Sequence, residues 1–230
     1  MNTLRENSAL RDRVSVFEDR KDAGKLLAER LVMYRDSGGI VLAIPSGGVP
    51  VAAEICPALN LPMDLIIVRK LQIPHNPEAG FGAMGPDGGI VLNEGLLERL
   101  GLSGEEIDTQ LKKTRDIIEK RNRIFRGGRP PPSVKDRIVI VVDDGLASGY
   151  TMLSAVRFLR RLAPKMVVSA VPTGAERTVD DLLPEVDELL CLNVRSGPFF
   201  AVAEAYRKWY DVGDEEVLSL IKGRNGYCRG

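Results

Sequence analysis

The chain contains 230 residues, of which 44% are hydrophobic and 28% are charged, and its 32 basic residues balance its 32 acidic residues. This length predicts one domain with an ample core, and a formal net charge of zero argues against a general attraction to nucleic acid or to acidic membranes. No apolar run approaches the roughly 20 residues of a membrane span, and residues 1–13 lack a signal-peptide core, so we expect a cytoplasmic protein.

The three cysteines are far apart in the sequence and odd in number. This spacing predicts neither a disulfide framework nor a zinc site. Cys56 and Cys191 lie in apolar stretches and are predicted to be buried, whereas Cys228 lies in a glycine-rich, basic tail that we expect to be mobile.

Predicted helices and strands alternate over the first 70 residues. Apolar residues at helical spacing predict a helix over residues 17–34. A buried strand is predicted over residues 40–44, followed by a turn at residues 45–50 and a helix to about residue 59. A second strand is predicted over residues 65–68.

Residues 72–89 interrupt this alternation with three prolines and five glycines. Because this composition cannot build a core of its own, we expect a long, mobile functional loop with a short hairpin.

A long helix is predicted from a capping box, Ser-Gly-Glu-Glu at residues 103–106, to about residue 125. Its end is basic, and two interpretations are open. The basic residues can form a solvated face that complements the helix dipole, or a patch for RNA or for a partner subunit. They are Lys120, Arg121, Arg123, Arg126 and Arg129.

Strands and helices alternate again after the proline-rich connector at residues 127–133. Strands are predicted over residues 138–142, 166–171 and 188–192, with helices over 151–162 and around 175–183. The alternation indicates a single α/β domain over residues 1–230, with a mainly parallel central sheet and right-handed crossovers.

The segment after the strand at residues 138–142 carries the clearest chemical signal. Five β-branched residues are followed by the acids Asp143 and Asp144 and then by a loop of glycine, small and hydroxyl residues. The free N–H groups and the positive dipole end of the next helix favour a phosphate, and the acids can hold sugar hydroxyls or Mg2+. The alternative is an ordinary strand-to-helix turn in which Ser148 or Thr151 caps the helix.

This segment resembles the phosphoribosyl-pyrophosphate (PRPP) motif of the type I phosphoribosyltransferases. The resemblance implies that Asp143 and Asp144 contact the ribose hydroxyls and that the loop holds the 5-phosphate. Ser148 stands where the family usually has threonine, and Tyr150 stands where it usually has glycine or alanine, so its ring could narrow the loop. The implied phosphate-binding residues are Gly145, Ala147, Ser148, Gly149, Tyr150 and Thr151.

The turn Ser46-Gly47-Gly48 also follows a buried strand and opens a helix, which makes it a second candidate anion cradle. It resembles the pyrophosphate loop of the same family, in which an arginine or lysine usually occupies the position of Ser46. A hydroxyl offers neither the charge nor the bidentate contacts of a guanidinium. We expect Arg69 and Lys70, which directly follow the second strand, to supply the missing charge.

The resemblance implies roles for two further segments. Residues 72–89 would form a flexible loop that closes over the site, in which Glu78 or His75 handles a proton. Lys70, just before this loop, would contact pyrophosphate. Residues 193–210 would contribute to the hood that receives the acceptor, although these aromatic residues could also cap the core. The candidate hood residues are Phe199, Phe200 and Tyr206.

The resemblance covers nearly the whole chain and implies a five-stranded, mainly parallel sheet with flanking helices and a small hood. The implied reaction transfers the phosphoribosyl group from PRPP to a nitrogen acceptor, such as a nucleobase, with release of pyrophosphate. Mg2+ would be held mainly through PRPP, with Asp143 and Asp144 as candidate ligands. Two alternatives are a non-catalytic regulatory protein that binds PRPP or a nucleotide, and a hydrolase of phosphoribosyl compounds. The expected partners are PRPP and a small acceptor, without membrane or nucleic acid, and the oligomeric state, a homodimer included, stays open.

Overall fold

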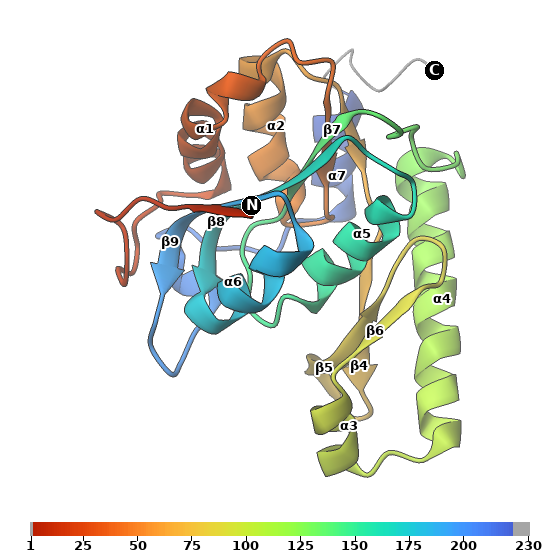
Figure 1. Ribbon diagram of the computed structural model, residues 1–230. Coiled ribbons are helices and arrows are strands. Elements are labelled where there is room, and N and C mark those ends of the chain that lie inside the picture. Colours follow the sequence, from red (N-terminus) through yellow and green to blue (C-terminus); the bar gives the residue numbers. More distant parts are fainter. Residues whose placement is uncertain (1, 223–230) are drawn as a thin grey trace.

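The central sheet of the computed structural model, which describes residues 2–222, has six parallel strands in the order β1-β9-β8-β7-β2-β3 (Figure 1). The predicted α/β class with a mainly parallel sheet is confirmed. The sheet has one strand more than predicted, because a short N-terminal segment pairs with β9 at the edge. The strands are β1 (Thr3–Arg5), β2 (Ile40–Ala43), β3 (Met63–Leu65), β7 (Ile138–Val142), β8 (Met166–Ala175) and β9 (Glu188–Arg195).

Both faces of the sheet are covered by helices, because successive residues of each buried strand point to opposite sides. In β7, Ile140 and Val142 pack into one core cluster, while Val139 and Val141 pack into the other. Complete burial of such a side chain is worth about 1.5–3 kcal/mol. One face is covered by α1 (Arg20–Arg30), α2 (Gly48–Leu59) and α7 (Asp214–Lys222), and the other by α5 (Tyr150–Arg160) and α6 (Glu176–Leu182) (Figure 1).

The strand order creates a switch point between β2 and β7. From β2 the chain crosses outward to β3, whereas from β7 it crosses in the opposite direction to β8 and β9. A crevice forms at the carboxyl ends of two neighbouring strands when their connections run in opposite directions. Open α/β sheets bind their ligands in this crevice. The turns that follow β2 and β7 are the two segments that the sequence singles out as anion cradles.

Residues 72–89 contain more regular structure than we predicted. They belong to an antiparallel sheet of β4 (Arg69–Ile73), β5 (Asn76–Met84) and β6 (Ile90–Leu92), which lies beside α4 and α5 (Figure 1). Phe81, Ala83 and Met84 are buried, and a Cβ atom on Gly82 would overlap the carbonyl oxygen of Val91. The glycines therefore permit close strand pairing here, and the flexibility of this segment stays a prediction.

The helix α4 (Gly104–Arg126) follows α3 (Glu94–Leu100) and begins with the predicted capping box. The Ser103 Oγ accepts from the backbone N–H of Glu106 at 3.3 Å, and Glu106 Oε2 accepts from the backbone N–H of Ser103 at 2.9 Å. The helix ends at Gly127, whose φ of 62° is in the left-handed region. Its first turns lie beside the small sheet, and its last turns reach the central sheet (Figure 1).

The helix predicted over residues 17–34 is shorter in the structure. Asp19 caps α1 by accepting from the backbone N–H groups of Lys21 and Asp22, and a short 3-10 helix, η1 (Val32–Tyr34), follows α1. Two further 3-10 helices are η2 (Leu183–Glu185) and η3 (Val202–Ala205).

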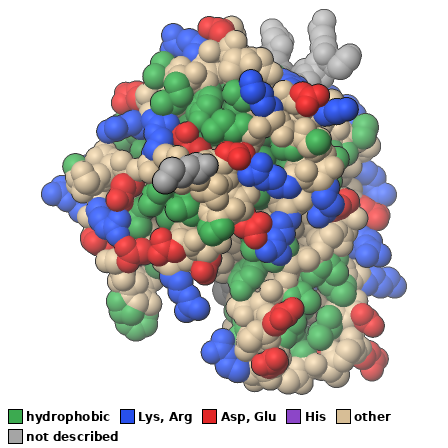
Figure 2. Space-filling model, in the orientation of Figure 1, with side chains coloured by type: hydrophobic (Ala, Val, Ile, Leu, Met, Phe, Trp, Pro, Cys, Tyr) green, Lys and Arg blue, Asp and Glu red, His purple; other side chains and the backbone are tan. Residues whose placement is uncertain are grey.

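Charges of both signs are interspersed over the face shown in Figure 2, as expected for a chain with balanced charge. Within residues 2–222, no helix is both long and apolar enough to cross a membrane. Cys56 and Cys191 are buried, as predicted, and Cys228 lies outside the described residues.

Candidate active site

The two candidate cradles meet at the switch point. Ala43 at the end of β2 lies opposite Val142 at the end of β7, and the backbone N–H of Ile44 donates to the carbonyl oxygen of Val142 at 2.9 Å. The turns therefore leave the sheet side by side and at the same level. Gly47 packs against the carboxylate of Asp144 so closely that a Cβ atom would overlap Oδ2. This contact joins the first turn directly to the acid pair.

The helices that follow these turns begin without a side-chain cap. Gly47 precedes α2, and Gly149, with a φ of 74°, precedes α5. In contrast, α1, α3 and α4 begin with Asp19, Asn93 and Ser103, whose side chains accept backbone N–H groups. The first-turn N–H groups of α5 are thus open to an anion, whose charge the helix dipole also favours. In α2, Gly48 and Val49 already donate to the carbonyl oxygens of Ile44 and Ser46, and Pro50 has no N–H. The turn before α2 can instead offer an anion the N–H groups of Ser46 and Gly47. The alternative in which Ser148 or Thr151 caps α5 does not hold, because Gly149 occupies the cap position.

The loop after β7 has a fixed base and an exposed crest. The backbone of Leu146 pairs with β8 through bonds of 2.9 and 3.0 Å, and Thr178 Oγ1 donates to the carbonyl oxygen of Ala147 at 2.6 Å. Ala147 and Ser148 are exposed, so the crest is accessible to a ligand. Tyr150 packs against the core cluster beneath α5. Its bulk is therefore accommodated partly within the fold.

Asp144 is held by a buried cation from α1. The Nε of Arg20 donates to Asp144 Oδ2 at 2.8 Å, and the side chains are 4% and 16% exposed. The Arg20 guanidinium lies 3.9 Å from the ring centroid of Trp209, and the hydroxyl of Tyr206 donates to the backbone oxygen of Asp144 at 2.6 Å. Contacts with aromatic faces stabilise a desolvated guanidinium. Aromatic residues of the C-terminal region thus fix the acid pair in place.

The two acids have different electrostatic settings. Burial raises the pKa of Asp143 well above its ordinary value, and the neighbouring Asp144 carboxylate raises it further. Burial also raises the pKa of Asp144, but Arg20 opposes that increase. Like charges that share a site cannot both ionise easily, so Asp144 keeps the negative charge and Asp143 holds the proton more tightly.

The acid pair fits a magnesium ion that is held mostly by its substrate. Within residues 2–222, no group of three or more His, Cys, Asp or Glu side chains forms a cluster that could hold a metal. Mg2+ is commonly bound by one or two carboxylates together with substrate phosphates and water, rather than by a complete protein cage. Asp143, whose carboxylate accepts the backbone N–H of Asp144 at 2.9 Å, is the acid that has most capacity left for such a ligand.

The Ser46 turn receives its positive charge from α4. Arg121 directs its guanidinium at this turn, with Nη2 3.3 Å from Ser46 Oγ and Nη1 3.4 Å from the carbonyl oxygen of Pro45. Arg69 lies near enough to Arg121 for their charges to interact. Burial and the charge of Arg121 lower the pKa of Arg69. Sequence reasoning expected help from Arg69 and Lys70 but missed Arg121, which it placed among a set of surface charges.

The candidate site residues of the small sheet do not lie together but at the two ends of the β4–β5 hairpin. Arg69 and Lys70 pair with Met84 and Ala83 at the base of the β4–β5 hairpin, and the stem of Lys70 runs along Gly80. His75 is at the opposite tip of this hairpin.

The tip of the hairpin lies far from the two turns. His75 is close enough to Glu106 to lower the pKa of its carboxyl. Glu106 precedes Arg121 by 15 residues of helix, which is roughly 22 Å. The structure therefore does not bring His75 to the turns, and the side chain of Glu78 lies outside the described residues.

The predicted hood residues are not in one place. Phe199 is 86% exposed, and Phe200 lies 5.9 Å from the guanidinium of Arg195. Tyr206 is buried, and its hydroxyl faces the backbone of Asp144 rather than an open surface. The proposed acceptor roles of these residues stay predictions.

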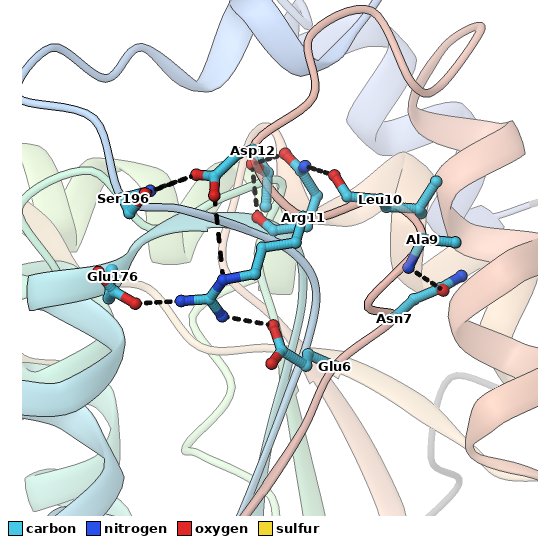
Figure 3. A network of polar contacts seen from close by, with 10 residues as sticks. Glu6, Asn7, Ala9, Leu10, Arg11, Asp12, Glu176 and Ser196 are labelled. Carbon is cyan, nitrogen blue, oxygen red and sulfur yellow. Dashed lines mark hydrogen bonds and ion pairs between the residues drawn. The ribbon is translucent and has the colours of Figure 1, made fainter.

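The beginning of the predicted hood, residues 193–210, is hydrogen-bonded to residues near the N-terminus (Figure 3). Asp12 Oδ1 accepts from the backbone N–H and the Oγ of Ser196 at 2.7 and 2.9 Å. Arg11 forms ion pairs with Glu6 and with Glu176 at the start of α6. These contacts join β1, the end of β9 and α6, so residues near the N-terminus position a segment almost 200 residues away.

Two functional candidates, Arg20 and Arg121, carried little signal in the sequence. Arg20 is an ordinary first-turn residue until the chain folds Asp144 and Trp209 around it. Arg121 was visible only as part of a basic helix end, for which we considered a solvated face or a patch for RNA or a partner. The structure divides that end, because Arg121 and Arg126 turn inward while Arg123 is exposed.

Comparisons with known proteins agree with this arrangement. The family model described as a phosphoribosyl transferase domain matches residues 17–202. Proteins of two Mycobacterium tuberculosis strains, each named "Putative phosphoribosyl transferase", are 38% identical over 208 residues, which cover 90% of this chain and 47% of theirs. The chain thus spans about half the length of these curated relatives.

Solved structures share the fold of this chain. The crystal structure of TT1426 from Thermus thermophilus is 35% identical, with a TM-score of 0.72, over 89% of this chain and 97% of that one. A hypothetical protein from Neisseria gonorrhoeae with bound ppGpp shares the fold, with a TM-score of 0.50 and 15% identity over 97% and 99% of the chains. The match over residues 17–202, together with the two turns at the switch point, shows that the chain belongs to the phosphoribosyl transferase domain family.

Proposed function

We propose that the protein binds PRPP across the β2 and β7 turns and transfers its phosphoribosyl group to a nitrogen acceptor, with release of pyrophosphate. One observation carries the proposal: two uncapped helix starts flank an acid pair at one switch point, with Gly47 in contact with Asp144. PRPP has a phosphate and a diphosphate at opposite ends of a ribose. Two anion cradles separated by carboxylates match this distribution of groups.

Each part of the site has a role in this proposal. The backbone N–H groups at the start of α5 hold the 5-phosphate, and those of Ser46 and Gly47, in the turn before α2, hold the diphosphate. Asp143 and Asp144 accept the ribose hydroxyls. Arg20 favours the ionised form of Asp144 and holds this carboxylate in position to accept hydrogen bonds.

The chemistry needs positioning and electrostatics more than covalent help from the protein. Departure of pyrophosphate from C1 leaves an oxocarbenium-like ribose, which the nearby carboxylates stabilise and the fixed turns align with the acceptor. Mg2+, when bound through the diphosphate, neutralises the charge that develops on the leaving group. The neutral N–H donors and nearby arginines stabilise the same charge from the protein side.

The first test is a pyrophosphate-release assay with PRPP and Mg2+ over a panel of purines, pyrimidines and simple amines. We expect release that depends on one class of acceptor. Asp144→Asn should weaken PRPP binding by roughly ten- to hundred-fold, the usual effect of losing a hydrogen bond to a charged group, because Asp144 is the acid that keeps the negative charge. Calorimetry with PRPP measures this change.

Asp136→Asn is the matched control, because Asp136 is an exposed acid just before β7 with a φ of 59°, which asparagine tolerates. It should bind PRPP like the wild type. Release from PRPP without any acceptor would indicate a hydrolase instead. PRPP binding without release under any condition would contradict transfer and indicate a regulatory binding protein.

A further inference from the structure

Arg121 is placed at the diphosphate end of the proposed site, although it comes from α4, outside the two turns. Its side chain is 18% exposed, and its guanidinium lies 5.4 Å from the ring centroid of Phe125. The two Nη atoms face Ser46 and the carbonyl oxygen of Pro45. Arg121 thus stands beside the position where the family usually carries a cation within the turn itself.

The contacts of Arg121 leave most of its hydrogen-bonding capacity unused. Its distances to Pro45, Ser46 and Asp214 are 3.4, 3.3 and 3.5 Å, all longer than the 2.9–3.0 Å typical of N–H···O bonds. Arg126, about one and a half turns further along α4, shows what a satisfied guanidinium looks like in this protein. It donates to both oxygens of Asp64 at 2.9 Å and to two backbone carbonyl oxygens at 2.7 Å.

The charges around Arg121 also favour the binding of an anion. The Arg69 guanidinium makes no hydrogen bond or ion pair with another residue in the described part of the chain. Burial and Arg121 lower its pKa, while Asp214 opposes this effect. Asp214 is half exposed and 3.5 Å from Arg121. One distant carboxylate neutralises the positive charges of these two guanidiniums only in part. A multiply charged anion would neutralise both.

We infer that Arg121 binds the diphosphate of PRPP and, together with Arg69, supplies the charge that Ser46 lacks. When the diphosphate binds, Arg121 then exchanges its ion pair with Asp214 for contacts with the diphosphate. The inference rests on the proposed function, because it assigns a ligand residue to the same site. It also explains how a turn without a cation can serve a diphosphate: the cation comes from the helix that the chain inserts between β3 and β7.

Calorimetry with pyrophosphate, PRPP and ribose 5-phosphate, each with Mg2+, tests this inference on the full chain. Arg121→Gln should lower the affinity for pyrophosphate and PRPP by roughly ten- to hundred-fold. It should leave the affinity for ribose 5-phosphate unchanged, because this ligand has no diphosphate. Arg121→Lys should recover only part of the loss, since it keeps the charge but not the fork of donors.

Arg123→Gln is the matched control, because Arg123 is exposed on the same helix end, and it should bind all three ligands like the wild type. Asp214→Asn should bind pyrophosphate more tightly, because it removes the competing carboxylate.

Three results would overturn the inference. Arg121→Gln could bind pyrophosphate as the wild type does, or could lose ribose 5-phosphate and pyrophosphate equally, which would make Arg121 a brace for the fold. Asp214→Asn could weaken pyrophosphate binding, which would make Asp214 a support for Arg121. Failure of the wild type to bind either PRPP or pyrophosphate would reject the proposed function and this inference together. The wild-type measurement alone distinguishes that failure from a failure of the inference about Arg121.

Discussion

At the scale of single residues, Asp143 and Asp144 are adjacent but chemically different. Asp144 has a buried cation, Arg20, at 2.8 Å, and its pKa is raised less than burial alone would dictate. Asp143 is buried and has a like-charged neighbour, so its pKa rises well above the ordinary value, although the hydrogen bond from the backbone N–H of Asp144 opposes the rise. A pair in which one member loses its proton more readily than the other can adjust its charge when a metal-bound ligand arrives.

Arg20→Met tests this electrostatic arrangement without any ligand. Removing one partner of a buried pair costs about 3–5 kcal/mol while the other partner stays charged. We therefore expect the free energy of unfolding to fall by an amount of this order at pH 8. Loss of Arg20 raises the pKa of Asp144, so the deficit should shrink as the pH falls and Asp144 becomes protonated in both proteins.

Urea unfolding at several values between pH 5 and pH 8 measures this deficit. Arg207→Met is the control, because Arg207 is 65% exposed and its ion pair with Glu18 is long, at 3.7 Å, so its effect should be small at every pH. A deficit for Arg20→Met that is equal at every pH would mean that Arg20 acts through packing on Trp209 alone.

At the scale of elements, α4 depends on a buried ion pair for its position. Arg126 at its last turn meets Asp64 of β3 through two bonds of 2.9 Å, and these side chains are 4% and 5% exposed. Asp64 Oδ1 also accepts from the backbone N–H of Leu65 at 2.6 Å. This pair joins the inserted helix to the edge of the central sheet and so determines where Arg121 stands.

Asp64→Asn should lower the free energy of unfolding by about 3–5 kcal/mol, because it leaves the Arg126 guanidinium buried without its counter-charge. The double variant Asp64→Leu/Arg126→Met should recover much of this loss. Urea unfolding measures both, with Arg123→Met as an exposed control on the same helix. A loss below about 1 kcal/mol for Asp64→Asn would mean that other contacts suffice to hold α4.

The elements show where sequence patterns succeed and where they do not. The run of β-branched residues before Asp143 and the capping box at Ser103 predicted β7 and the start of α4, because both signals are local. The extra strand β1 escaped prediction, because it is specified by a pairing partner, β9, that is distant in the sequence. Of the small sheet only a short hairpin was predicted, because its prolines and glycines are typical of a loop. Glycine at 82 suggested a loop, whereas the structure uses it for close contact with β6.

The candidate site follows the same division. Asp143, Asp144, Ser46 and the two glycines after it could be identified because a strand, a turn and a helix start are contiguous in sequence. Arg20 and Arg121 could not, since each lies at least 75 residues from its partner at the site. Arginines are frequent on surfaces, and only the tertiary structure distinguishes those that turn inward.

At the scale of the whole molecule, the strand order determines where the chemistry can be. The chain leaves β2 and β7 in opposite directions, and the turns after these two strands are the glycine-rich segments. Segments from both ends of the chain then converge there: α1 brings Arg20, and the segment after β9 brings Tyr206. One site therefore depends on segments at residues 20, 46, 121, 143 and 206, which only the complete sheet brings together.

Competition calorimetry with PRPP, pyrophosphate and ribose 5-phosphate tests most directly whether the two turns form one site. If they do, ribose 5-phosphate and pyrophosphate should bind at the same time, each to its own turn, and prior binding of PRPP should exclude both. PRPP should also bind more tightly than either fragment, because it spans both turns at the cost of a single association. PRPP binding that displaces only one fragment, or that leaves both bound, would contradict a single site across the β2 and β7 turns.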